Sequence, residues 1–135
     1  MSERPAKILV VEDEGLVALL LQEALIDFGY EVAGPVPNTW KALKLLADEA
    51  IDAAVLDVNL GGERVDPVAE ALAAASIPFI FATGYSDRAA LPAAFRDRAT
   101  LHKPYGMEQV HRALIQLLAA ATEASVLATG TRITH

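Results

Sequence analysis

Hydrophobic residues are distributed along this chain in two alternating patterns. Short hydrophobic runs, most of them closed by polar residues or glycine, are typical of β-strands. They occur at 7–11, 30–33, 53–57, 78–82 and 100–102. Between these runs, hydrophobic residues recur every three or four positions, which is typical of helices. Those segments are 14–28, 38–49, 66–75 and 107–121. The pattern therefore predicts strands that alternate with helices.

This alternation predicts an α/β fold with helices on both faces of a parallel sheet, because parallel strands need right-handed crossover connections. Five such units suit a doubly wound, five-stranded parallel sheet in the flavodoxin-like order 2-1-3-4-5. Segment 86–98 takes the place of the fourth helix, but Pro92 lies inside it, so we expect a short or broken helix there. We expect one domain over 7–121, an N-terminal extension over 1–6, and a C-terminal tail over 122–135 that is free to be flexible.

Individual residues refine these elements. Segment 30–33 alternates polar and apolar residues, as an edge strand does, and Gly34-Pro35 predicts a turn after it. Asp66 is expected as the N-cap of the helix that follows it, with a proline as its first helical residue. The large apolar residues expected to face the core in the first two helices are Leu16, Leu19 and Leu20, and Trp40, Leu43 and Leu46.

The composition narrows the class of protein. The chain has 135 residues, of which 53% are hydrophobic, enough for one domain with a substantial core. No apolar stretch approaches the ~20 residues of a membrane span, and the N-terminus lacks the features of a signal peptide. The absence of cysteine fits the cytoplasm, and a net charge of −7 argues against direct binding to nucleic acid. We therefore expect a cytoplasmic protein that binds neither membranes nor nucleic acids directly.

Acidic residues follow two of the predicted strands. Glu12 and Asp13 come directly after 7–11, and Asp57 ends the run 53–57. The first and third strands are neighbours in the predicted order, so these carboxylates should converge where ligands bind in such sheets. Two like charges ~4 Å apart cost ~4 kcal/mol at an effective dielectric of 20, so a proton or a cation must neutralise them. Mg²⁺, or Mn²⁺ in its place, suits a few carboxylates together with phosphate oxygens.

The remaining strand ends supply groups for phosphate. Thr83 offers a hydroxyl, Lys103 offers a mobile positive charge, and Gly84 leaves room for a phosphate or its donor. The bond before Pro104 is a candidate cis peptide that would aim the lysine inward. Taken singly, each of these residues also has an ordinary structural explanation. Only their combination with Asp57 predicts a nucleophilic carboxylate that receives a phosphoryl group.

This combination of residues resembles the receiver domain of two-component response regulators, over the chain as far as about residue 121. The resemblance implies that Asp57 is the phosphoacceptor and that Thr83 and Lys103 grip the phosphoryl group. It also implies that Asp13 and Asp57 bind the metal directly, that Glu12 acts through water, and that the backbone carbonyl of Asn59 completes the metal site.

The segments 78–85 and 55–62 further resemble the receiver subfamily nicknamed FAT GUY, which is associated mostly with sensor histidine kinases of the HWE and related classes. The aromatic residue of the usual receiver switch falls at Thr100, so the common switch is not expected in its ordinary form. We expect Tyr85 to take over part of that role. Asn59 and Tyr85 are also candidates for tuning how water reaches the acyl phosphate.

These features predict a phosphoacceptor that assists its own phosphotransfer and dephosphorylation but is not an enzyme. Its donor would be a histidine kinase or phosphotransfer protein, and its output would be protein–protein binding or a phosphate sink. A phosphorylation-independent binding module on the same fold is the alternative. An aspartate-nucleophile phosphatase is disfavoured because such enzymes commonly place a second acid where Asn59 stands. A flavin binder is disfavoured by the acids after the first strand. The oligomeric state stays open.

Overall fold

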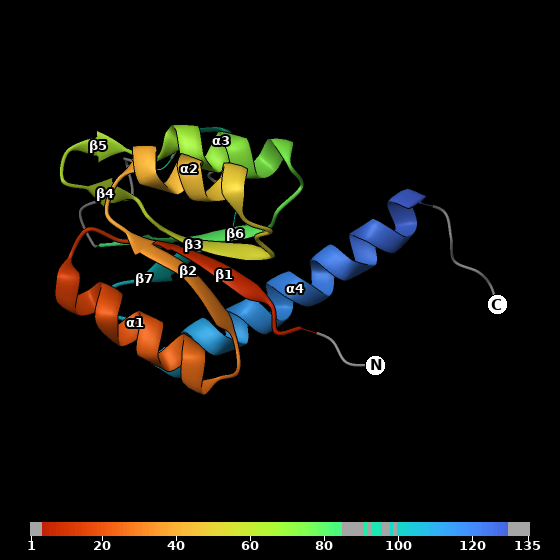
Figure 1. Ribbon diagram of the computed structural model, residues 1–135, viewed down its shortest axis with the longest axis horizontal. Helices are drawn as coiled ribbons and strands as arrows, with labels where there is room; N and C mark the ends of the chain where they lie inside the picture. Colours follow the sequence, from red (N-terminus) through yellow and green to blue (C-terminus); the bar gives the residue numbers. More distant parts are fainter. Residues whose placement is uncertain (1–3, 85–90, 92, 96–97, 99, 130–135) are drawn as a thin grey trace.

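A computed structural model describes residues 4–84, 91, 93–95, 98 and 100–129, and the statements below concern these residues. The five main strands form one parallel sheet in the order β2-β1-β3-β6-β7 (Figure 1). Counted along the chain, this order is 2-1-3-4-5, so the predicted topology is confirmed. The strands are β1 Lys7–Val11, β2 Glu31–Val36, β3 Ala53–Asp57, β6 Phe79–Thr83 and β7 Thr100–His102.

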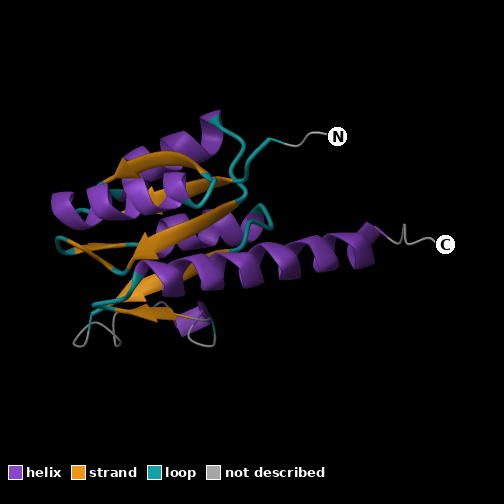
Figure 2. Ribbon diagram, turned by 90° about the horizontal axis from the view of Figure 1, so that it is seen from below, coloured by secondary structure: helices purple, strands orange, loops and turns teal. Residues whose placement is uncertain are grey.

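Two helices cover each face of the sheet (Figures 1 and 2). Helices α1, Gly15–Asp27, and α4, Met107–Thr129, lie on one face. Helices α2, Thr39–Asp48, and α3, Asp66–Ala74, lie on the other. Side chains alternate between the faces as strand geometry requires, so Leu9 belongs to the core under α2 and α3, and Ile8 to the core under α1.

Most of the predicted fourth helix, 86–98, lies outside the described residues. Those that are described include a single 3-10 turn, η2, at Ala93–Phe95. The ring of Phe95 packs against Phe79 and Phe81 at centroid distances of 5.4 and 6.3 Å. The guanidinium of Arg98 covers the ring of Phe79 at 4.5 Å. Phe95 and Arg98 therefore pack against the aromatic side chains of β6.

The prediction of which apolar residues face the core was wrong in α1 and, except for Leu46, wrong in α2. Leu16, Leu19 and Leu20 are 65%, 48% and 48% exposed, while Ala18, Leu21 and Leu25 are buried. In α2, Trp40 is 66% exposed and Leu43 is exposed, whereas Ala42 is fully buried and Leu45 and Leu46 are half-buried against the core. Both helices carry large apolar residues on more than one side, so spacing alone does not identify the buried side.

The turn predicted at Gly34-Pro35 is instead part of a strand, because β2 continues to Val36. The Gly34–Pro35 bond is cis, and the pairing of β1 with β2 shifts register between Leu9 and Val11. A proline is tolerated here because β2 is an edge strand. Gly34 has a φ of +95°, and a Cβ at this position would lie 2.8 Å from the nitrogen of Val36, so the position requires glycine.

A two-stranded hairpin that was not predicted follows β3. Its strands are β4, Asn59–Leu60, and β5, Glu63–Arg64, and they pair antiparallel. Gly61 and Gly62 both have positive φ, as the tight turn of a two-residue hairpin requires. The helix that follows begins at Asp66 with Val65 as its N-cap, so Asp66 is the first helical residue and not the predicted cap.

Helix α4 continues eight residues past its predicted end, to Thr129. The predicted tail therefore begins as regular helix, and both views show the last turns of α4 projecting beyond the edge of the sheet (Figures 1 and 2). No helix in the described part of the chain is long and apolar enough to cross a membrane.

The burial of α1 gives a paired test of the core. Leu25 is fully buried and Leu16 is 65% exposed in the same helix. Leu25→Ala should lower the free energy of unfolding by about 2–5 kcal/mol, because it removes buried methyl groups and leaves a cavity. Leu16→Ala should change it by less than about 1 kcal/mol. Urea denaturation measures both values, and equal losses would contradict the packing described here.

Candidate functional site

Asp57 ends the central strand β3, between β1 and β6, and its side chain is only 2% exposed. Each carboxylate oxygen has a donor. The backbone N–H of Asn59 donates to Oδ1 at 3.0 Å, and the ammonium of Lys103 donates to Oδ2 at 3.1 Å. A buried charge is tolerated when it is paired and hydrogen-bonded in this way. The site is therefore built around a buried carboxylate, held by two hydrogen bonds, at the carboxyl edge of the sheet.

The predicted convergence of acids is confirmed. Glu12 and Asp13 follow β1 directly. The register of β1 against β3 pairs Val11 with Leu56, so the next residues on the two strands, Glu12 and Asp57, lie side by side. One carboxylate oxygen each from Glu12, Asp13 and Asp57 lie within 4.8 Å of one another. Asp13 is exposed and the other two are buried, so the cluster opens to solvent on one side. This oxygen-only set fits Mg²⁺, which keeps several waters beside one or two carboxylates.

Glu12 carries the most perturbed carboxyl of the site. Its pKa is raised to about 7, first because burial removes water from the charged form and then because Asp57 lies beside it. The backbone N–H of Glu14 donates to its carboxylate at 3.1 Å and opposes the rise. Burial beside a second carboxylate therefore favours the protonated form of Glu12 when no metal is bound. Because its pKa is higher in the folded chain than the ordinary 4.5, its contribution to stability declines as the pH rises between these values.

Lys103 lies just past β7 and points into the acidic cluster, as predicted. Its ammonium lies 3.1 Å from Asp57 and 3.4 Å from Glu12. Burial alone would lower the pKa of Lys103, but the two carboxylates outweigh burial and raise it. The backbone N–H of Lys103 donates to the carbonyl of Thr83 at 2.9 Å, which ties β7 to β6 at the site. The Lys103–Pro104 bond is cis, as proposed from the sequence.

Thr83 ends β6 and is fully buried, but its hydroxyl does not contact Asp57 in this structure. The hydroxyl donates to the carbonyl of Gly84 at 2.8 Å. Gly84 follows at the same edge, and Tyr85 lies outside the described residues. Thr100 is half-buried on β7, where it pairs with Phe81. The strand ends thus bring together Asp57, Glu12, Asp13 and Lys103, with Thr83 at the adjacent strand end.

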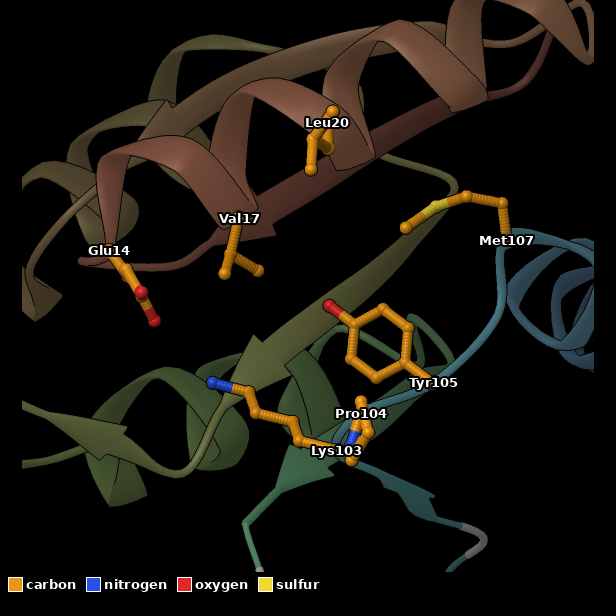
Figure 3. A pocket seen from close by; sticks show the side chains of 7 residues that line it. All are labelled: Glu14, Val17, Leu20, Lys103, Pro104, Tyr105 and Met107. Carbon is orange, nitrogen blue, oxygen red and sulfur yellow. The ribbon is translucent and has the colours of Figure 1, made fainter.

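A cavity of about 350 Å³ adjoins Lys103 and was missed from the sequence. Residues at the start of α1 line one side, and the segment after β7 lines the other (Figure 3). The hydroxyl of Tyr105 is buried and has no hydrogen-bond partner among the described residues. Burial, and then the charge of Glu12, raise the pKa of Tyr105 to about 12. In the sequence, only the position of Tyr105, two residues after Lys103, could have indicated this cavity. The lining residues are Glu14, Val17, Leu20, Lys103, Pro104, Tyr105 and Met107.

Comparison with known proteins agrees with this geometry. The family model of the response regulator receiver domain matches residues 8–115. Curated relatives include the transcriptional regulatory protein PdtaR of Mycobacterium tuberculosis, 28% identical over 85 residues, and the phyllosphere-induced regulator PhyR of Methylorubrum extorquens, 29% identical over 90. These matches cover 62% and 64% of this chain, but only 42% and 34% of the relatives, so the chain spans less than half of their length.

Solved structures match over more of the chain. The solution structure of SdrG from Sphingomonas melonis Fr1 is 48% identical, covers 87% of this chain and 99% of SdrG, and gives a TM-score of 0.76. The BeF3-activated conformation of SdrG, given as from Pseudomonas melonis Fr1, is 50% identical over the same shares, with a TM-score of 0.70. A receiver domain of a modulated diguanylate cyclase from Desulfovibrio desulfuricans G20 is 28% identical, with coverage of 89% and 98% and a TM-score of 0.79.

The raised pKa of Glu12 predicts a pH-dependent metal affinity. A proton on Glu12 competes with a divalent cation, so the affinity for Mg²⁺ should rise about tenfold from about pH 6 to about pH 8. Glu12→Gln should remove most of this dependence, and Glu14→Gln, which alters an exposed neighbour, should keep it. Titration calorimetry measures the affinities. A wild-type affinity that is flat across this range would contradict the assignment.

The positive charge of the Lys103 ammonium should repel a cation that binds to the neighbouring carboxylates. Lys103→Ala should therefore strengthen Mg²⁺ binding, by about tenfold or more, because unit charges ~4 Å apart interact by ~4 kcal/mol at an effective dielectric of 20. Lys44→Ala removes the same charge from an exposed position on α2 and should leave the affinity within about twofold. Calorimetry at one pH and ionic strength compares the two variants, and equal effects would refute an electrostatic role for Lys103.

Proposed function

This chain belongs to the response regulator receiver domain family, and on that premise we propose that Asp57 accepts a phosphoryl group from a phosphohistidine. The observation that carries this proposal is the placement of Asp57. Its buried carboxylate lies at the open edge of the sheet, beside two further acids and an ammonium 3.1 Å away. A nucleophilic carboxylate with a neighbouring cation is the arrangement that phosphoryl transfer to aspartate requires.

The acidic cluster fits the metal ion that receiver domains generally bind. We propose that Glu12, Asp13 and Asp57 hold Mg²⁺, or Mn²⁺ in its place, together with the backbone carbonyl of Asn59. When bound, the ion neutralises charge on the phosphoryl oxygens. The oxygen-only chemistry of these three carboxylates supports this choice over metals that prefer nitrogen or sulfur ligands.

The transfer is an in-line displacement. One carboxylate oxygen of Asp57 attacks phosphorus and forms the new O–P bond, while the N–P bond of the donor breaks and its electron pair stays on the imidazole nitrogen. Lys103 already lies at Oδ2 and pairs with a phosphoryl oxygen as charge builds up there. Thr83 exchanges its bond to the Gly84 carbonyl for one to the phosphoryl group. Gly84 leaves room for this group.

The partners and output that we propose rest on the receiver family and on the net charge of the chain. We propose a sensor histidine kinase of the HWE or a related class, or a phosphotransfer protein, as the donor, and the cytoplasm as the location. The chain accelerates its own phosphorylation and dephosphorylation, with Tyr85 and Asn59 tuning access of water, and does not turn over a separate substrate. Output is binding to another protein or removal of phosphate from the kinase. The net charge of −7 supports protein and not nucleic acid as the direct partner.

One specific observation favours a second candidate, a phosphorylation-independent binding module. Thr100 lies on β7 where receivers usually carry the aromatic residue of their switch, and the hydroxyl of Thr83 donates to the carbonyl of Gly84. In that case a partner would bind equally to the free and phosphorylated forms. Unchanged partner affinity in Asp57→Asn would favour this candidate over the phosphoacceptor.

Phosphotransfer to the purified chain tests the leading proposal. With Mg²⁺ and either a small phosphodonor or a phosphorylated histidine kinase, the wild-type chain should acquire an acid-stable, base-labile label. Asp57→Asn should lose it entirely, because the amide is no nucleophile. Asp48→Asn, a change of the same kind at the exposed end of α2, should label like the wild type. Labelling that survives Asp57→Asn would refute the assignment.

A further inference from the structure

The β4–β5 hairpin lies beside two carboxylates of the site, those of Asp57 and Asp13. Through Asn59, the first residue of the hairpin, it donates a backbone N–H to Oδ1 of Asp57 at 3.0 Å. Its turn also lies against Asp13, because a Cβ on Gly61 would come within 3.3 Å of the Asp13 carboxylate. Any change in the charge or position of these two carboxylates therefore acts directly on the hairpin.

The other strand of the hairpin contacts the start of α2. The carboxylate of Glu63 accepts the backbone N–H of Thr39 at 3.1 Å and the hydroxyl of Thr39 at 3.0 Å. Thr39 is the first residue of α2, so this carboxylate also lies at the positive end of the helix dipole. Figure 1 shows the hairpin beside α2, on the face of the sheet that α2 and α3 cover. The hairpin thus bridges the acidic site and one end of a helix.

The residue after Thr39 is Trp40, which is 66% exposed and is the only tryptophan of the chain. A large aromatic side chain at the surface, one residue from a contact made by the hairpin, changes its surroundings when that contact changes. Tryptophan emission from this protein therefore comes from the start of α2 alone.

We propose that the hairpin transmits the phosphorylation state of Asp57 to the start of α2, by weakening the contact between Glu63 and Thr39 and so altering the surface around Trp40. This inference rests on the proposed function and adds a route of regulation to it. The route leaves the site through β4 and β5 and does not pass through β7, where Thr100 replaces the usual aromatic residue.

The physical reason lies in the acceptor at Asp57. In the free form Oδ1 belongs to a charged carboxylate, and charge-assisted hydrogen bonds are about twice as strong as neutral ones. Attachment of phosphorus to either oxygen converts the carboxylate into a mixed anhydride, so the bond from Asn59 loses its charge assistance. The phosphoryl group also brings about 1.5 to 2 negative charges to the rim. The hairpin shifts, and the exposed contacts of Glu63 are weak enough to yield.

The experiment uses the full chain with Mg²⁺ and beryllofluoride as the mimic of the acyl phosphate. Fluorine NMR shows whether beryllofluoride binds, and NMR measures solvent exchange of the Thr39 amide. On binding, this exchange should accelerate about 2- to 10-fold, which corresponds to the loss of one ordinary hydrogen bond, and Trp40 emission should change. In Glu63→Ala, exchange should be fast from the start and show no further change on binding. Glu70→Ala, an exposed glutamate on α3, should behave like the wild type.

Reciprocity gives a second readout, because coupling between two sites acts equally in both directions. If binding at Asp57 must weaken the Glu63 contact, removal of that contact should tighten beryllofluoride binding by the same factor of about 2 to 10. Normal binding with unchanged Thr39 exchange and unchanged Trp40 emission would overturn the inference and leave the proposed function standing. Failure of the wild-type chain to bind beryllofluoride would overturn the phosphoacceptor proposal, and this inference with it.

Discussion

Repulsion among three carboxylates is the constraint on which this site depends. Glu12, Asp13 and Asp57 place ligand oxygens within 4.8 Å of one another, and two of the three are buried. Such a group is tolerable only with compensating charge. In this structure the ammonium of Lys103 lies beside Glu12 and Asp57, and the raised pKa of Glu12 favours its uncharged form. Any cation that enters this cluster would compete with the ammonium of Lys103 and with protonation of Glu12.

The sheet holds these groups together against their repulsion. The parallel strands β1, β3 and β6 are buried on both faces, and their carboxyl ends lie at one edge. The polar residues that follow each strand are consequently positioned by a backbone that is fixed by core packing and not by their own contacts. The energy that keeps charges close comes from burial of apolar side chains such as Leu9, Leu56 and Phe81.

Two features of the site's surroundings bear on how it connects to the rest of the fold. The residue on β7 that would couple to Thr83 is Thr100, while the hairpin after β3 contacts Asp57 on one side and α2 on the other. The exposed apolar residues Trp40 and Leu43 stand on the helix reached by the hairpin, so its surface chemistry suits contact with another protein.

The sequence by itself determined the five strands of the main sheet, their order and the meeting of Glu12, Asp13, Asp57 and Lys103. Strand patterns are local, and parallel topology places the carboxyl ends of these strands at one edge. Only the tertiary structure decided which side of α1 and α2 is buried, as Leu16 and Trp40 show, since both helices are apolar on several sides. It also decided that Gly34-Pro35 continues a strand, that a hairpin follows Asp57, and that burial beside Asp57 raises the pKa of Glu12. Each of these depends on neighbours distant in the sequence, whose burial and charge no local pattern contains.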